Sequence, residues 1–506
     1  MPESAPSVAS SVRADAEPTA LRFATWAVGL VVVIAAWAVC ANLGAAPPGR
    51  MSEQRCHRVA VHMVKSGAWI VPIDHGMPRL QKPPLYYWLA ATAVMVSGEV
   101  SYAMTRLPSA LAAVLLLVVT FHWAKRYGGT SAGLLAVVAL LSTDQFQDNA
   151  RRGDAEMVFA LASVAALLTL QRAVESGRGR DLTWFAVAFA LAVLAKATAA
   201  LVTVLVPIAA WAVFDARVRA RLDRGFALAV LAAACAGFAW YGVVLTRVVG
   251  AWSELVGHAA RPLGVDDPGG DADHYRAPYF FVKQLPSILG PIVVGVPWLA
   301  WQAWRSRREI PRPASLVAGI AFAAMFVAFS VVPQKQPHYL LPAIPVLCVS
   351  LALALERRLR AATMEFAVLR LCVVGLALGV AGYGAVEWTW ARAFVPGADV
   401  VASALAACGV LVAVVAVAIA LRGREATAWR TLAIACALVV AVRAAHVAPW
   451  RATIKAATEG EIAVVDIAGV ADVALVSRIA HVQAAAAEHR VAAWVFDVDD
   501  ALTKDD

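Results

Sequence analysis

Charged residues are scarce in this chain. Only 16% of its 506 residues are Asp, Glu, Lys or Arg, whereas soluble proteins usually carry about a quarter. The residues that remain are 61% hydrophobic and are grouped in apolar runs of roughly 18 to 24, long enough to cross about 30 Å of hydrocarbon. A soluble domain is therefore excluded, and the sequence predicts an all-α polytopic membrane protein.

Paired cysteines are also missing. The seven cysteines are scattered, mostly inside apolar runs, and no CxxC or His/Cys pairing accompanies them. This pattern excludes a disulfide framework and a cysteine-ligated zinc site. The net charge of +9 does not indicate nucleic acid as a partner, because the basic clusters fall in alternate short loops, as the positive-inside rule expects. These loops, predicted to be cytoplasmic, are 125–126, 178–180, 217–224, 305–308, 357–360 and 422–424.

The apolar runs predict about thirteen transmembrane helices within a domain that covers residues 21–448. The spans are placed at 22–43, 105–124, 130–143, 156–172, 182–198, 199–214, 225–246, 285–304, 314–332, 339–355, 364–386, 400–421 and 430–448. Residues 1–20 are polar and predict a disordered cytoplasmic tail. Residues 449–506 mix strand-like and helical patterns, which predicts a small α/β unit on the outer side of the membrane.

The first outer loop, residues 44–104, is unusually long and polar. Segments 51–66 and 83–98 have amphipathic or anchor-like patterns and predict two helices lying in the membrane interface. The side chains predicted to face one side of the first helix are Val59, Met63 and Val64, with Glu53, Arg55, Arg58 and Lys65 pointing elsewhere. The predicted headgroup-level anchors of the second are Tyr86, Tyr87 and Trp88. Physics alone leaves interfacial packing and an active-site role both open.

Several motifs recur in a recognisable order. An acidic residue after the first span is followed by GAWIVP, QKPPLYYWL and RLPSAL, and further along by ARRGDAEMVF (150–159) and KQPHYLLPAIP (335–345). A His-x-x-Arg pattern lies within 257–281. Over about residues 22–356 the chain resembles the glycosyltransferase C superfamily. The branch that it resembles contains the lipid A aminoarabinose transferase and the protein mannosyltransferases.

The resemblance implies a membrane glycosyltransferase at the outer face of the bacterial inner membrane. Such an enzyme moves a sugar from a polyprenyl-phosphate donor to a lipid, glycan or protein acceptor, with inversion at the anomeric carbon. No cofactor besides that lipid substrate is expected, and the protein is expected to be a monomer. The charges of the short loops and the count of thirteen spans predict a cytoplasmic N-terminus and a periplasmic C-terminus.

The resemblance also assigns roles to individual residues. The donor phosphate is expected to contact Lys82, Arg261, Tyr339 and Lys335. The carboxylates expected in catalysis are Glu53 and Asp154, and the other expected substrate contacts are Arg55, His258, His274 and Tyr86. Each residue also has a plainer reading. Lys82 alone is typical of a snorkelling lysine, and Asp154 next to Arg151 and Arg152 is typical of a local ion pair.

The chain departs from the family pattern at three positions near one site. Ser52 stands where the family has Asp, Cys56 where it has Tyr, and Gln81 where it has Glu. Gln81 removes one candidate ligand of the metal reported for some members of the family and leaves His258 without that partner, so no structural metal is predicted. These departures keep two alternatives open: a protein that binds or flips polyprenyl lipids, and a catalytically inactive relative.

Overall fold

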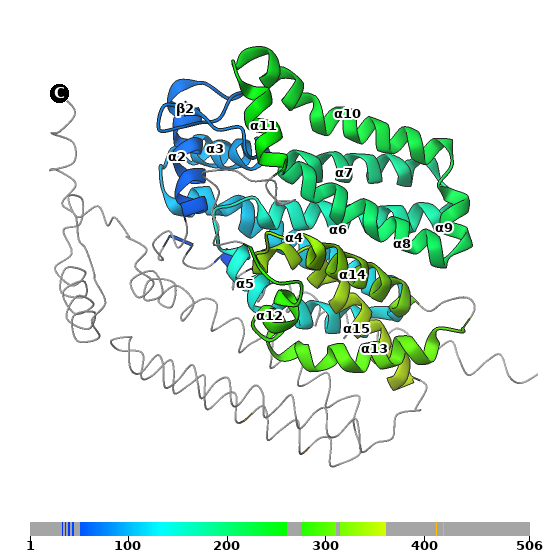
Figure 1. Ribbon diagram of the computed structural model, residues 1–506. Helices are drawn as coiled ribbons and strands as arrows, with labels where there is room; N and C mark the ends of the chain where they lie inside the picture. The colour runs from blue at the N-terminus through cyan, green and yellow to red at the C-terminus, as the bar shows by residue number, and fades with distance from the viewer. Residues whose placement is uncertain are drawn as a thin grey trace, which may run out of the picture.

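The computed structural model describes residues 51–260, 275–309 and 314–360, together with single positions at 33, 36, 39, 40, 43, 44, 411 and 418. The predictions for residues 1–20, for most of the first span, for the last three spans and for residues 449–506 lie outside this range. Long helices lie side by side with their axes roughly aligned (Figure 1). The described helices include α5 (Asp144–Ala150), α6 (Glu156–Ser176), α9 (Ala216–Arg221), α10 (Arg224–Arg247), α11 (Ala251–Ala260), α14 (Ala314–Val331), η6 (Pro337–Leu340) and α15 (Ala343–Arg360).

Five of the described helices are long and apolar enough to cross a membrane. One of them, α4 (Tyr102–Leu141), contains a break at Gly129, where φ is 77° and ψ is −176°. A Cβ built on Gly133 would lie 2.7 Å from the Phe121 ring, although twelve residues of straight helix span about 18 Å. The chain therefore folds back at Gly129, and the two arms of α4 match the predicted spans 105–124 and 130–143.

A second break occurs at Lys196 inside α7 (Gly179–Ala200), where φ is −155° and ψ is 85°. A π-helical turn, η2 (Leu201–Leu205), and α8 (Val206–Phe214) follow. Contacts with α6 show the direction of the chain. Lys196 pairs with Glu156, and seven residues further along both segments the hydroxyls of Thr203 and Ser163 lie 3.0 Å apart. The segment after Lys196 thus runs parallel to α6, so Lys196 sits at the turn between the predicted spans 182–198 and 199–214.

The predicted continuous span 285–304 is wrong. The chain forms α12 (Phe280–Leu289), a 3-10 turn η5 (Gly290–Val294) and α13 (Gly295–Ser306) instead. Gly290 has a positive φ of 57°, and the following residue is proline, which ends the helix. Hydropathy alone does not predict this break, because Gly and Pro can end a helix without making the segment less hydrophobic.

The first outer loop contains the two predicted helices, α2 (Met51–Ser66) and α3 (Leu85–Ser97). Between them lies a short hairpin that was not predicted, β1 (Ile73–Asp74) paired with β2 (Met77–Pro78). Its two turn residues, His75 and Gly76, both have positive φ, which is typical of tight hairpin turns. Arg58 of α2 donates to Asp74 at 2.9 Å and fixes the hairpin against the helix.

Two predictions about side-chain orientation in this loop are wrong. Tyr86 and Tyr87 are 1% and 2% exposed, so they are core residues rather than headgroup anchors. Glu53, expected to point away from the apolar face of α2, is buried with Cys56 and Met63. Both errors have the same cause. Other parts of the protein pack against α2 and α3, so the buried face of each helix is wider than that of a helix lying only in the membrane interface.

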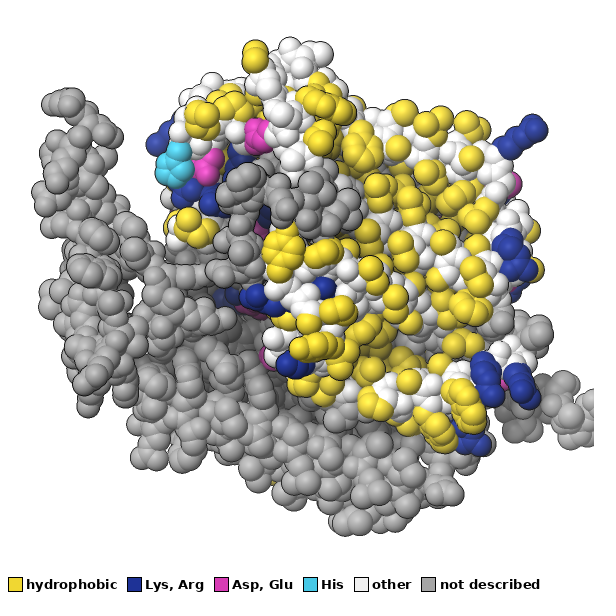
Figure 2. Space-filling view, in the orientation of Figure 1, with side chains coloured by type: hydrophobic (Ala, Val, Ile, Leu, Met, Phe, Trp, Pro, Cys, Tyr) yellow, Lys and Arg dark blue, Asp and Glu magenta, His cyan; other side chains and the backbone are white. Residues whose placement is uncertain are grey.

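The first loop is packed onto the ends of the long helices. The Trp240 indole of α10 donates to the Ile70 carbonyl at 2.7 Å, and Leu80 is buried with Trp240, Val244 and Ala251. In Figure 1 this loop lies at one end of the aligned helices and α9 at the other. Hydrophobic side chains cover the flank between these ends, and basic side chains gather at both (Figure 2). This arrangement fits helices that cross a bilayer with the polar loop on one face.

Candidate functional site

Lys82 lies in the loop that leads into α3, and its ammonium group faces acidic neighbours. No hydrogen bond or ion pair of its side chain is formed within the described residues. Burial lowers the pKa of Lys82, but the nearby groups, led by Glu156 and including Asp154, outweigh burial and raise it. Lys82 is therefore a positive charge without a direct partner among the residues that the structure describes, which suits an anionic ligand.

Asp154 is held in the turn between α5 and α6. Its carbonyl accepts from the Ser109 hydroxyl at 3.0 Å, and its Oδ1 accepts from the backbone N–H of Glu156 at 3.1 Å. Burial and the neighbouring Glu156 carboxylate raise the pKa of Asp154, while Lys82 and Arg152 lower it less. The carboxyl group is thus buried, fixed in direction and readier to hold a proton than an exposed Asp.

Glu156 and Lys196 are site residues that sequence reasoning missed. The Lys196 ammonium lies 2.5 Å from Oε1 and 2.6 Å from Oε2 of Glu156, and the Nε2 atom of His338 lies 3.5 Å from Oε1. Glu156 opens α6, where the helix dipole stabilises a carboxylate. A signal was present in the sequence, because a lysine inside an apolar run is a candidate for function.

Tyr339 also belongs to this cluster, although it lies far from Lys196 in the sequence. It belongs to η6, and the Lys196 ammonium lies 5.7 Å from the centre of its ring. Burial and Glu156 raise the pKa of Tyr339, whereas Lys82 lowers it. The structure therefore brings together Lys82, Asp154 and Tyr339, which the sequence analysis assigned to one site.

Glu53 is part of a buried polar contact beside this cluster. Its Oε1 accepts from the Nε atom of Arg106 at 2.6 Å and from the backbone N–H of Gly153 at 2.9 Å. Arg106 also donates to the carbonyl of Leu43 at 2.6 Å. Glu53 therefore fastens α2 to α4 and to the turn that carries Asp154.

Cys56 occupies the same face of α2 as Glu53, one helical turn further along. Burial raises the pKa of its thiol to about 12, and the charges around it are those of Lys82, Asp154, Arg79 and Glu53. The thiol is consequently neutral and unreactive. Because Cys56 lies beside Lys82 and Asp154, the replacement of the family's Tyr by Cys56 falls within the candidate site.

The remaining predicted residues are placed less centrally. Lys335 is buried, and its ammonium donates to the carbonyls of Arg276 at 2.9 Å and Pro333 at 3.5 Å. The Tyr86 hydroxyl donates to the Thr105 carbonyl at 2.8 Å. Both side chains are thus engaged within the protein, and their expected contacts to substrate stay predictions.

Three of the predicted site residues have side chains that the structure does not describe. Arg261 and His274 lie outside the described residues, and the His258 side chain is not described although its backbone belongs to α11. Arg55 is half-buried on α2. Among the residues that the structure describes, no group of three His, Cys, Asp or Glu side chains is arranged to hold a metal ion. The absence of a structural metal stays a prediction, because His274 and the side chain of His258 are not described.

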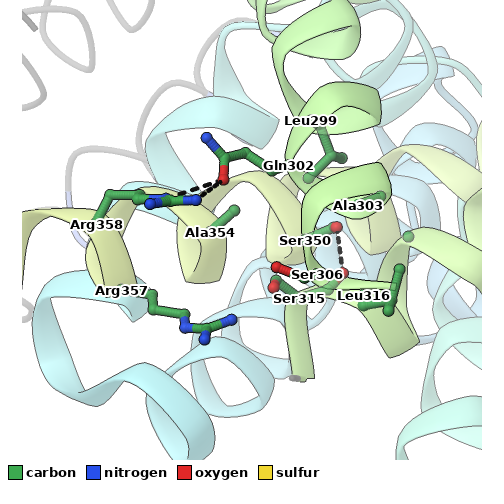
Figure 3. Close-up of a pocket in the computed structure, with 11 residues that line it drawn as sticks. Leu299, Gln302, Ala303, Ser306, Ser315, Leu316, Ser350, Ala354, Arg357 and Arg358 are labelled. Atoms are coloured by element: carbon green, nitrogen blue, oxygen red, sulfur yellow. Dashed lines mark hydrogen bonds between the residues drawn. The ribbon is translucent and has the colours of Figure 1, made fainter. Parts of the chain in front are cut away.

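Two cavities lie away from this cluster, between the first turns of α14 and the arginine-bearing ends of α13 and α15. One, of about 30 Å³, has room for a single water molecule and is shown in Figure 3. There Arg358 donates to Gln302, and the Ser350 hydroxyl donates to the Ser315 carbonyl at 2.6 Å. The neighbouring cavity, of about 250 Å³, shares Ser315 and Arg357 with the first. Neither is lined by Lys82, Asp154 or Tyr339, so neither is the candidate site.

Comparison with known proteins gives concordant matches. Residues 81–241 match the family described as dolichyl-phosphate-mannose-protein mannosyltransferase. An undecaprenyl phosphate-alpha-4-amino-4-deoxy-L-arabinose arabinosyl transferase of Pseudomonas aeruginosa is 27% identical over 320 residues, which are 61% of this chain and 56% of that protein. The protein of the same name from Edwardsiella ictaluri is 25% identical over 328 residues, with the same two coverages. The chain thus spans a little over half the length of these curated relatives.

Solved structures share the fold. The crystal structure of ArnT from Cupriavidus metallidurans in the apo state has a TM-score of 0.69 at 21% identity, covering 88% of this chain and 80% of that one. The same protein bound to undecaprenyl phosphate gives 0.66 at 22% identity, covering 87% and 80%. These matches agree with the resemblance that the motifs indicated: the chain is similar to aminoarabinose transferases and to the mannosyltransferase family, and it shares the fold of ArnT.

Proposed function

We propose that this protein is a membrane glycosyltransferase that takes a sugar from a polyprenyl-phosphate donor. The observation that carries the proposal is the Lys82 ammonium, which has no direct partner within the described residues and lies within electrostatic range of Asp154, Glu156 and Tyr339. The names of the relatives describe transfer from undecaprenyl phosphate, and one ArnT structure holds that lipid. A half-buried cation and a fixed carboxyl group are the two parts that such a transfer needs.

In this proposal Lys82 and the Tyr339 hydroxyl hold the donor phosphate, joined by Arg261. As the bond between the anomeric carbon and the phosphate oxygen breaks, its electron pair moves to the phosphate. A cation already fixed beside that oxygen stabilises the developing charge without reorganisation. The acceptor hydroxyl forms the new bond to the anomeric carbon from the opposite face, which inverts that centre.

The acceptor hydroxyl must lose its proton in this step, and we assign that proton to Asp154. Its carboxyl group accepts a hydrogen bond from the backbone N–H of Glu156, its backbone carbonyl accepts one from Ser109, and it lies within electrostatic range of Lys82. Glu53, the other expected catalytic acid, is engaged by Arg106 and Gly153. We therefore assign Glu53 to positioning: it holds the turn that presents Asp154.

The function is tested by lipid analysis of cells that lack the gene and of cells that carry variants. Loss of the gene should remove one glycosylated envelope product, and Asp154→Asn should not restore it although the protein is present in the membrane. An Asp154→Asn variant that restores the product in full would overturn the catalytic assignment. The acceptor, whether lipid, glycan or protein, would be identified by the product that disappears.

The alternative function is polyprenyl-lipid binding or flipping without transfer. It is favoured by one observation, the replacement of the family Asp by Ser52 next to Glu53. Such a protein would bind polyprenyl phosphate through Lys82 but would be unaffected by Asp154→Asn. The same complementation experiment therefore separates the two functions.

A further inference from the structure

Glu156 acts electrostatically on four residues of the candidate site. On each of Lys82, Asp154, Lys196 and Tyr339, its charge acts more strongly than that of any other residue. It is 3% exposed, and both of its oxygens lie within 2.6 Å of the Lys196 ammonium. The proposed function assigns no role to Glu156.

The pairing determines how many positive charges the site offers to a ligand. Lys82 has no direct partner within the described residues, whereas Lys196 is neutralised by Glu156. The Lys196 ammonium lies 5.7 Å from the centre of the Tyr339 ring, and the Lys82 charge acts on both Lys196 and Tyr339, so both lysines act on the proposed phosphate site. The ion pair with Glu156 therefore removes one positive charge from those that the site can offer to a ligand.

The donor and the product of the proposed reaction differ in charge. A sugar polyprenyl phosphodiester carries one negative charge, whereas the polyprenyl phosphate monoester left after transfer carries about 1.5 to 2 at neutral pH. A site in which Lys196 is neutralised therefore favours the diester more than a site in which Lys196 is free. A free Lys196 would add one cation, hold the monoester more tightly and retain the product.

We propose that Glu156 is a specificity-determining residue that keeps Lys196 neutralised, so that the site prefers the singly charged phosphodiester donor and releases the doubly charged phosphate product. This inference rests on the proposed function. It concerns charge selection by the site and is independent of which residue accepts the proton.

The test is a binding measurement that needs no turnover. The purified full-length protein and the Glu156→Gln variant are titrated at pH 8 with a polyprenyl phosphate and with its methyl phosphodiester. Glu156→Gln frees the Lys196 ammonium, so it should bind the monoester about 10-fold or more tightly than wild type, the effect of one charged hydrogen bond. Affinity for the diester should change less than about 3-fold.

Two further variants show whether the effect passes through Lys196. The gain in monoester affinity should vanish in the double variant Glu156→Gln with Lys196→Gln. Lys196→Gln alone leaves the Glu156 carboxylate unneutralised and should weaken the monoester more than the diester, which keeps the inference testable if Glu156→Gln fails to fold. Glu175→Gln is the matched control, because Glu175 is ion-paired with Arg126 at the opposite end of α6. It should change neither affinity.

The outcomes separate the two proposals. If wild type binds neither lipid, the proposed function fails and this inference fails with it. If wild type binds both lipids and Lys82→Gln binds neither, but Glu156→Gln changes both affinities equally, only the role of Glu156 is overturned. A gain that persists in the double variant would also overturn it.

Discussion

The Glu53 carboxylate and the backbone N–H of Gly153 lie 2.9 Å apart and join two segments one hundred residues apart in sequence. The same oxygen accepts from Arg106, and the two side chains of that pair are 3% and 2% exposed. Because Gly153 directly precedes Asp154, this contact determines where the Asp154 carboxyl group is presented. Glu53, which the sequence analysis expected to react, thus holds in place the acid to which we assign the proton.

Breaking the Glu53–Arg106 pair should destabilise the protein strongly. Glu53→Gln leaves a buried guanidinium without its counter-charge, which costs about 3–5 kcal/mol of unfolding free energy. Thermal and denaturant unfolding in detergent measure the change. The control is Arg126→Met, which removes a pair whose side chains are 44% and 28% exposed and should cost less than about 1 kcal/mol. Equal losses in the two variants would contradict the assignment.

Removing the Lys82 charge should weaken lipid-phosphate binding. A hydrogen bond to a charged group contributes about 1.5–3 kcal/mol, so Lys82→Gln should bind polyprenyl phosphate about 10- to 100-fold less tightly. Lys335→Gln is the control, because its ammonium is engaged by the Arg276 carbonyl. That variant should lose stability and keep its lipid affinity. A loss of affinity at Lys335 equal to that at Lys82 would return Lys335 to the phosphate site.

Asp154 should give the transfer reaction a distinct pH dependence. Burial and Glu156 raise its pKa above the ordinary 3.8, and only the ionised form accepts a proton, so activity should rise with pH through that raised pKa. Stability should change in the opposite direction. The folded state keeps a proton that the unfolded chain has lost, so the free energy of unfolding falls as pH rises from 3.8 through the folded pKa.

Asp154→Asn should lower the transfer rate by about 10²- to 10⁴-fold, the usual contribution of a general base. The acidic limb of the pH profile should be lost with it, while polyprenyl phosphate remains bound. A wild-type profile whose acidic limb is unchanged in Asp154→Asn would assign that limb to another group.

The break in α4 should depend on glycine at position 129. Its φ of 77° with ψ near 180° is accessible almost only to glycine, so Gly129→Ala should cost about 1–3 kcal/mol of unfolding free energy. Gly242→Ala is the matched control, since Gly242 lies inside α10 with nothing within 4 Å of its added Cβ. There the change should be neutral or stabilising by up to about 1 kcal/mol. Equal melting temperatures for the two variants would show that the break tolerates a side chain.

Much of the helical architecture was predictable from the sequence. In lipid every backbone polar group must be satisfied within its own segment, so an apolar run of sufficient length is a helix whatever surrounds it. The predicted spans 225–246 and 314–332 therefore agree with α10 and α14 to within a residue at each end. The helix predicted at 51–66 has the bounds Met51–Ser66.

The candidate site was predictable only in part. Motif order pointed to Lys82, Asp154 and Tyr339, and the structure brings these three together. It did not reveal that Glu53 is held by Arg106, because a charge on a helix looks the same in sequence whether it faces solvent or a partner 53 residues away. The burial of Tyr86 was missed for the same reason.

The sequence by itself determined which segments are helical and which face carries the unusual polar residues, because hydropathy and local backbone chemistry act over a few neighbouring positions. Only the tertiary structure decided the charge of the site. Whether Lys196 and Lys82 both remain available depends on Glu156 lying 2.5 Å from the first and only within electrostatic range of the second. Coulomb energy depends on distance in space and on burial, neither of which is written in the order of the residues.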